Sequence, residues 1–442
     1  MTLLLILLSV AAIVLLITKL KLHPFLALLF VSIAFGLATG MKTALIISSI
    51  QEGFGGTLGK IGLIIILGVI IGAFLEHTGG ALKLAEKILQ LIGPKRVTTA
   101  MGIIGYVVSI PVFADSGFIL LSSLNKNLTK KAGLSLAGTA IALGLGLSCT
   151  HALVPPTPGP IAAAGILNAD LGLVMLLGLF VAAVALVAAL VFAKKAASKI
   201  YINPDFDNQA KDPETNYSPS LLRSSFPIVI PIILIVFKSL SVFLNDQGWQ
   251  LTLKNIFSFI GEPVIALIIG FFFCLLLPKR LERSMLSTSG WVGKALTDSA
   301  TIILITGAGG IFGKILQNSD LANIIGQSLT DYPIGIWLPF ILAAALKSAQ
   351  GSSTVALITT ASIMASLMTT LGLTSEMDKA MVVISIGAGS LIVSHANDSF
   401  FWVVTQMSGM DVKTGYKLHT VGTLVIGTSA MICLFILFKL FH

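Results

Sequence analysis

Long runs of uncharged residues dominate the chain, and short segments rich in lysine and arginine separate them. Thr2 to Thr18, followed directly by Lys19 and Lys21, is one such run. About 20 apolar residues in a helix span the hydrocarbon core of a bilayer. Only 11% of the 442 residues are charged, whereas globular domains carry roughly a quarter. We therefore expect an all-α polytopic membrane protein with about 11–14 transmembrane segments.

The net charge of +9 does not indicate a nucleic-acid-binding protein. The lysines and arginines lie mostly between the apolar runs, where basic residues set the orientation of a membrane protein. Cys149, Cys274 and Cys433 lie far apart in apolar stretches, so they predict neither a disulfide framework nor a metal site. We expect the lipid bilayer as the main partner, with no nucleic acid, metal or cofactor.

Two of the uncharged runs, Ala132 to Ala169 and Ser348 to Ser375, are too long for one ordinary crossing, and each contains a break. The first break extends from Ser148 to Pro160 and contains Pro155-Pro-Thr-Pro-Gly-Pro160, and the second extends from Ser348 to Thr354 and contains Gln350-Gly-Ser-Ser-Thr354. We expect the substrate to bind between the two breaks. Proline removes a backbone donor and clashes with the preceding turn of a helix. Non-helical backbone is tolerated at membrane depth only where it faces protein or a water-filled cavity. The breaks therefore predict a polar cavity within the membrane.

Basic residues also predict a re-entrant hairpin, because Lys95 and Lys130 both favour the cytoplasm and the segment between them must return to one side. A hairpin followed by a broken helix in each half is the layout of inverted-repeat transporters. The expected division is a first membrane repeat at 1–200 (hairpin about 97–131, broken helix about 132–169), a cytoplasmic linker at 201–223, and a second membrane repeat at 224–442 (hairpin about 296–328, broken helix about 333–371).

The breaks also predict a binding site for a small organic anion. A half-helix that begins at a break points free N–H groups and a positive dipole end at the cavity, which suits a carboxylate. Serine and threonine hydroxyls at the second break can bond the hydroxyls of a polyol acid. The expected binding residues are Asp115, Ser116, Ser148, Thr150, His151, Thr157, Gly159, Gln350, Ser352, Ser353, Thr354, His395 and Asn397.

Ionisable residues inside apolar surroundings usually mark a transport pathway. His395 and Asp398 lie three residues apart and share a helical face if the segment is helical. Such a pair either holds and releases a proton near neutral pH or forms a structural hydrogen bond. Lys314 and Lys347 are expected to reach the membrane interface from helix ends. The candidates for proton coupling are Asp398, His395, His151 and Asp115.

The chain resembles the gluconate:proton symporter (gluconate permease) family over almost its whole length. The resemblance lies in Glu52-Gly-Phe-Gly-Gly-Thr-Leu-Gly59, Pro155-Pro156 with Pro158-Gly-Pro160, Asn168-Ala-Asp170, Gly351-Ser-Ser-Thr-Val355 and Ser394-His395 with Asn397-Asp398. It implies a bacterial inner-membrane carrier that imports gluconate or a related sugar acid or hydroxy acid with a proton. The broader ion-transporter superfamily implies a homodimer in which a transport part moves as an elevator.

Two departures from the family pattern, Thr157 and the hairpin tip at 113–117, leave glycerate-like acids, other hexonates and D-serine open as substrates. Three other mechanisms also stay open. Backbone carbonyls and hydroxyls at the breaks can hold sodium instead of a proton. A passive anion channel would need no coupling residue. An intramembrane hydrolase would need Asp115 and Asp398 within proton-sharing distance, and it leaves the two breaks unexplained, so we do not expect an enzyme.

Overall fold

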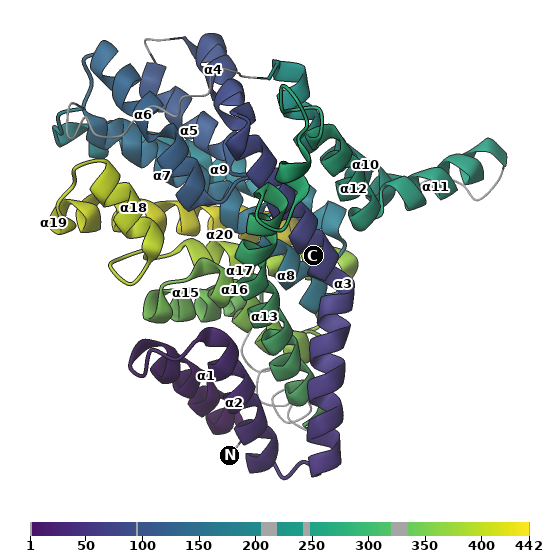
Figure 1. Ribbon diagram of the computed structural model, residues 1–442. Coiled ribbons are helices and arrows are strands. Elements are labelled where there is room, and N and C mark those ends of the chain that lie inside the picture. The colour runs from purple at the N-terminus through teal and green to yellow at the C-terminus, as the bar shows by residue number, and fades with distance from the viewer. Residues whose placement is uncertain (1, 94–95, 205–218, 242–247, 320–334, 442) are drawn as a thin grey trace.

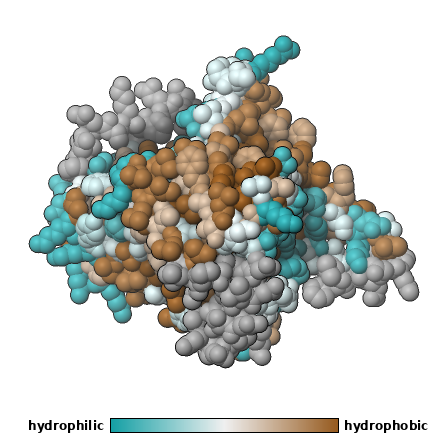
Figure 2. Space-filling view, turned by 90° about the horizontal axis from the view of Figure 1, so that it is seen from below, coloured by the Kyte–Doolittle hydropathy of each residue, from teal (hydrophilic) through white to brown (hydrophobic). Residues whose placement is uncertain are grey.

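The computed structural model describes residues 2–93, 96–204, 219–241, 248–319 and 335–441. Within these ranges the regular structure is entirely helical, which confirms the predicted all-α membrane fold (Figure 1). Six described helices are long and apolar enough to cross a bilayer, or seven if a bent pair counts as one span. Apolar side chains cover the middle of the face shown in Figure 2, and hydrophilic ones gather towards its edges.

Among the described residues, the first half contains nine α-helices, of which α3 is the longest. Its helices are α1 Thr2–Thr18, α2 Pro24–Ala38, α3 Thr43–His77, α4 Gly80–Ile92, α5 Val97–Val108, α6 Ala114–Lys131, α7 Leu136–Leu153, α8 Pro158–Leu167 and α9 Leu171–Lys195. The segment expected to form a hairpin consists of α5 and α6, which contact each other. Helices α7 and α8 follow one another as a single interrupted span.

The second half repeats much of this plan. Its helices are α10 Leu221–Leu240, α11 Gly248–Ile260, α12 Pro263–Cys274, α13 Trp291–Asn318, α15 Trp337–Gln350, α16 Ser353–Leu367, α17 Glu376–Leu391, α18 Ser399–Met407, α19 Val412–Gly415 and α20 Val421–Phe441. A short π-helix, Tyr416–Thr420, joins α19 to α20. Most of the expected linker at 201–223 lies outside the described residues.

The hairpin of the second half is α15 with α16, whereas the sequence predicted it at about 296–328. Residues 296–318 belong to the continuous helix α13, so that prediction is wrong there, and 320–328 lie outside the described residues. The segment expected to be a broken helix at about 333–371 instead folds back, because α15 and α16 pack side by side. Its turn contains Gly351, whose φ of +91° favours glycine.

The broken helix of the second half is α17 with α18, interrupted at 392–398. Helix α17 packs on α15 and α20, just as α7 packs on α5 and α9 in the first half. The internal repeat therefore pairs the turn before α6 with the turn before α16. It pairs the break between α7 and α8 with the break between α17 and α18, and not with the segment around Ser348.

The second hairpin was predicted from the glycine-rich segment Gly307-Ala-Gly-Gly310-Ile-Phe-Gly313. These glycines lie within α13 and serve helix packing and not a turn. Helices α3 and α13 lie side by side (Figure 1). A Cβ atom on Gly307 would lie 2.4 Å from Phe54, and one on Gly310 would lie 2.2 Å from Thr57. Small residues let membrane helices approach closely. An ion pair between Lys314 and Glu52, with 3.0 Å between nitrogen and oxygen, also joins the two helices.

We expect the substitution Gly53→Ala to destabilise the protein by about 1–3 kcal/mol, because the new methyl group overpacks the contact between α3 and α13. A Cβ atom on Gly53 would lie 2.6 Å from the Gly310 carbonyl oxygen. Gly55→Ala is the matched control, because no atom outside its own helix lies within 4 Å of the added carbon. Thermal unfolding of both variants in detergent tests this, and equal midpoints would contradict the packing role.

Candidate functional site

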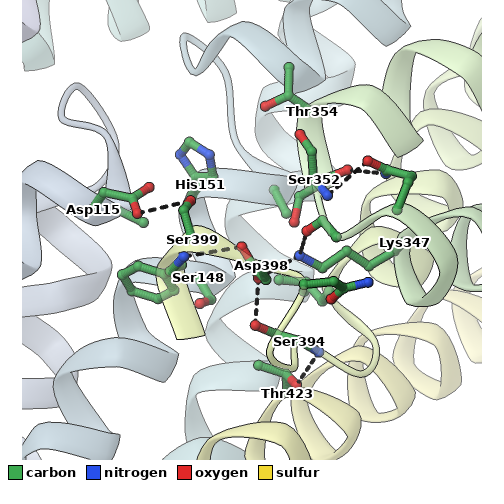
Figure 3. Close-up of a pocket in the computed structure, with 18 residues that line it drawn as sticks. Asp115, Ser148, His151, Lys347, Ser352, Thr354, Ser394, Asp398, Ser399 and Thr423 are labelled. Atoms are coloured by element: carbon green, nitrogen blue, oxygen red, sulfur yellow. Dashed lines mark hydrogen bonds and ion pairs between the residues drawn. The ribbon is translucent and has the colours of Figure 1, made fainter. Parts of the chain in front are cut away.

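The main cavity lies where the interrupted segments of the two halves meet. It has a volume of about 300 Å³ and lies among the start of α6, the end of α7, the turn between α15 and α16, and the break between α17 and α18 (Figure 3). Most of the residues that line it have polar side chains. The polar side chains are Asp115, Ser148, His151, Lys347, Gln350, Ser352, Ser353, Thr354, Ser394, Asn397, Asp398, Ser399 and Thr423.

Three helices begin at this cavity: α6 at Ala114, α16 at Ser353 and α18 at Ser399. The first turn of a helix has unpaired N–H groups and the positive end of the helix dipole. Side chains satisfy some of these donors, since Ser352 accepts a hydrogen bond from the Val355 N–H and Asp398 accepts one from the Phe400 N–H. Asp115 in the first turn of α6 and Asp398 at the N-cap of α18 offset part of the positive potential at those two ends, whereas the first turn of α16 contains no acidic residue. The free N–H groups at these termini suit an anion in the cavity.

The strongest interaction at the cavity is the ion pair between Lys347 and Asp398. Their nitrogen and oxygen lie 2.6 Å apart, and the two side chains are only 2% and 11% exposed. The Lys347 ammonium also donates to the Gly351 carbonyl, and Asp398 accepts a hydrogen bond from the Ser394 hydroxyl. The pair therefore joins the turn of the α15–α16 hairpin to the break between α17 and α18.

The expectation that Lys347 reaches the membrane interface is wrong. Lys347 does lie near the end of a helix, but α15 ends in the interior of the protein, where this residue is 1% exposed. A buried charge that has no partner is very costly. Asp398 supplies that partner for Lys347.

Asp115 has a different environment from Asp398. Its carboxylate accepts a hydrogen bond from the Ser399 hydroxyl at 3.4 Å. No cation forms an ion pair with it within the part of the chain that the structure describes. The cavity thus holds two carboxylates, of which only Asp398 is neutralised by a lysine.

His395 and Asn397 stabilise the end of α15. The His395 Nε2–H and the Asn397 amide both donate to the Ser348 carbonyl, at 2.9 and 3.0 Å. The predicted pairing of His395 with Asp398 on one helical face is wrong, because 392–398 is not helical and Asp398 bonds Lys347 and Ser394 instead. His395 does not line the cavity.

The cavity brings together nine of the residues predicted from the sequence. They are Asp115, Ser148, His151, Gln350, Ser352, Ser353, Thr354, Asn397 and Asp398. Besides His395, the predicted residues Ser116, Thr150, Thr157 and Gly159 do not line it.

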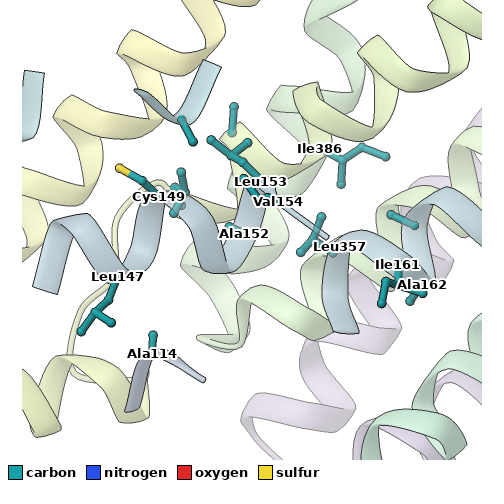
Figure 4. Close-up of a cluster of buried hydrophobic side chains, with 14 of the residues drawn as sticks. Ala114, Leu147, Cys149, Ala152, Leu153, Val154, Ile161, Ala162, Leu357 and Ile386 are labelled. Carbon is teal, nitrogen blue, oxygen red and sulfur yellow. The ribbon is translucent and has the colours of Figure 1, made fainter. Parts of the chain in front are cut away.

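The proline-rich break lies outside the main cavity, among apolar side chains such as Leu153, Val154 and Leu357 (Figure 4). Thr157 donates to the Val154 carbonyl. A Cβ atom on Gly159 would lie 2.6 Å from Leu357, so this glycine allows α8 to approach α16. The expectation that the whole of 148–160 faces the cavity is therefore wrong, since only the end of α7 faces it.

Sequence reasoning missed Lys347 and Thr423 as lining residues, whereas Ser394 and Ser399 belong to a segment expected to line the cavity and do line it. Ser394 and Ser399 flank Asp398 in the sequence and are recognisable from it. Thr423 lies in a run that reads as an ordinary membrane span, so nothing in its sequence surroundings marks it.

We expect Lys347→Met and Asp398→Asn each to destabilise the protein by about 3–5 kcal/mol, because each leaves a buried charge or polar partner unsatisfied. The double variant should recover most of this loss, because it removes both charges together. Thermal unfolding in detergent of the two single variants, the double variant and the original protein forms the required cycle. Losses that simply add would contradict the pairing.

Comparisons with known proteins agree with these features. The chain matches the GntP family permeases over residues 1–441. It is 33% identical to the gluconate permease of Pseudomonas aeruginosa, covering 98% of this chain and 96% of that one. It is also 33% identical to the D-serine transporter DsdX of Escherichia coli, covering 98% and 97%.

The fold is similar to that of the YdaH transporter of Alcanivorax borkumensis, with a TM-score of 0.62 over 89% of this chain and 88% of that chain. At 14% identity this similarity shows the fold alone. The family match and the relatives show more, because they extend over nearly the full length and the relatives are named as a permease and a transporter. The chain is a member of the GntP permease family, a family of membrane transporters and not of enzymes.

Proposed function

We propose that this transporter imports gluconate or a related sugar-acid or hydroxy-acid anion together with a proton. The observation that carries the proposal is the composition of the main cavity. Three helix N-termini converge there beside two carboxylates and one ammonium group. The expected location is a bacterial inner membrane, in which the protein forms a homodimer whose cavity-bearing part moves as an elevator.

Recognition of the anion follows from the helix termini and the hydroxyl groups. The starts of α16 and α18 supply N–H donors and positive dipole ends for a carboxylate. Ser148, Ser352 and Thr354 add side-chain hydroxyls around the same space. A volume of about 300 Å³ lies at the lower end of the range for small-molecule sites. This volume suits a single short polyol acid.

Coupling to a proton follows from the charge of the cavity. Asp115, Asp398 and Lys347 together carry one negative charge in excess when both carboxylates are ionised. An incoming anion adds a second negative charge. Two like charges about 4 Å apart repel by about 4 kcal/mol at an effective dielectric constant of 20. A proton that enters with the anion removes this repulsion.

We assign the transported proton to Asp115. Lys347 and Ser394 both stabilise the ionised form of Asp398, which therefore gains little from binding a proton. Asp115 accepts a weak hydrogen bond from Ser399 and has no lysine partner among the described residues. Asp398, which the sequence also indicated as a coupling residue, then acts as the fixed partner of Lys347.

D-serine is the second candidate substrate, because one relative is named as a D-serine transporter. Its ammonium group would find an unpaired carboxylate in Asp115, and its carboxylate would find the same helix termini. In that case Asp115 would bind the substrate directly and would not carry the transported proton.

We expect proteoliposomes containing the protein to accumulate a sugar acid or hydroxy acid when an inward proton gradient is imposed, and not when only a sodium gradient is imposed. Asp115→Asn should reduce accumulation at least about tenfold but retain exchange of labelled for unlabelled substrate, because its cavity has lost the negative charge that requires the proton. The control is Glu376→Gln, which removes an exposed carboxylate at the first residue of α17, whereas Leu391 at the other end of that helix lines the cavity.

Several results would overturn these assignments. Accumulation driven by sodium alone would exclude proton coupling, and uptake of D-serine in preference to every acid tested would favour the second substrate. Full proton-driven accumulation by Asp115→Asn would remove this residue from the coupling role.

A further inference from the structure

A buried histidine that the sequence did not mark lies behind the cavity. His419 is fully buried in the π-helix Tyr416–Thr420, and its ring contacts the rings of Phe400 and Phe401, with centroids 5.6 and 6.0 Å away. Its Nε2 atom lies 3.1 Å from the Ser394 hydroxyl oxygen. Single π turns within helices occur frequently at functional sites.

The direction of the hydrogen bonds follows from the chemistry of the groups. An ionised Asp398 can only accept, so the Ser394 hydroxyl donates its hydrogen to the Asp398 Oδ2 atom (Figure 3). The Ser394 oxygen then accepts from the Nε2–H group of His419. The Nδ1 atom of His419 is buried and has no hydrogen-bond partner among the described residues.

The same short stretch of chain satisfies the backbone of Ser394. The Ser394 N–H donates to the Thr423 hydroxyl at 3.1 Å, and the Ser394 carbonyl accepts from the Thr420 hydroxyl at 2.6 Å. Ser394 lies in the break after α17, where helical hydrogen bonds are missing. Thr420 and Thr423 thus replace helical bonds of the Ser394 backbone, and His419 bonds its side chain.

We propose that His419 is a positioning residue for substrate binding. Its N–H group fixes the orientation of the Ser394 hydroxyl, and that hydroxyl holds Asp398 in place. Asp398 in turn binds Lys347 through Oδ2 and the first turn of α18 through Oδ1. The start of α18 therefore keeps the position that an anion in the cavity requires. This inference rests on the proposed function in one respect, which is that the substrate binds in this cavity.

The test compares uptake kinetics of four variants in proteoliposomes. His419→Leu and Ser394→Ala should each raise the KM about tenfold, because each removes a link in the hydrogen-bond chain to a charged group. The double variant should show the same rise and not the product of the two, because both residues act through Asp398. His419→Gln retains an N–H donor and should restore a KM near that of the original protein. Lys417→Gln, an exposed change in the same π-helix, is the control.

The outcomes separate this inference from the proposed function. Uptake should be measured with sugar acids, hydroxy acids and D-serine. The KM for whichever of these compounds is transported then tests the positioning role. An original protein that accumulates none of the acids overturns the proposed substrate class. Variants whose Vmax falls while the KM is unchanged, or a double variant whose effects multiply, overturn the positioning role. Thermal unfolding midpoints of the same variants require no substrate, and additive shifts there would also overturn it.

Discussion

The ion pair between Lys347 and Asp398 joins the two interrupted segments in the second half of the chain. Backbone groups at such interruptions lack helical partners and cannot turn to water at membrane depth. In this structure, side chains from neighbouring segments form hydrogen bonds with these backbone groups. Lys347 bonds the Gly351 carbonyl, and His395 and Asn397 bond the Ser348 carbonyl. These bonds hold the hairpin turn and the helix break together beside the cavity.

The arrangement of charges links this framework to transport. Lys347 neutralises one of the two carboxylates at the cavity, and the convergent helix termini supply positive potential without another cation. Asp115 supplies the remaining negative charge. The helix termini therefore attract the carboxylate of an incoming anion, whereas the excess negative charge of the cavity repels it. In our account a proton resolves that conflict, so coupling follows from the charge balance of the cavity.

Much of the fold could be predicted from the sequence, because long apolar runs allow few alternatives in a membrane. The run from Thr2 to Thr18 coincides with α1, and 97–131 contains the two helices α5 and α6. The position predicted for the second hairpin was wrong because glycine has two structural roles in this chain. Gly307 and Gly310 allow close helix packing, whereas Gly351 allows a turn, and the sequence alone does not separate these roles.

The candidate site was predicted less completely, for related reasons. Residues beside the second break, such as Ser352 and Thr354, line the cavity as predicted, whereas Thr157 beside the prolines does not. Whether Lys347 faces lipid or protein depends on where α15 ends in three dimensions, and His419 gains its role only through contacts with Ser394. Such contacts between distant segments leave no local pattern in the chain.

The central claim is that the excess negative charge of the cavity obliges a proton to enter with the anion. Calorimetric titration of the purified protein with a transported acid, in buffers of different ionisation enthalpy, measures the protons taken up on binding. We expect about one proton per anion at a pH where Asp115 is ionised in the free protein. Anion binding without proton uptake under the same conditions would contradict the account.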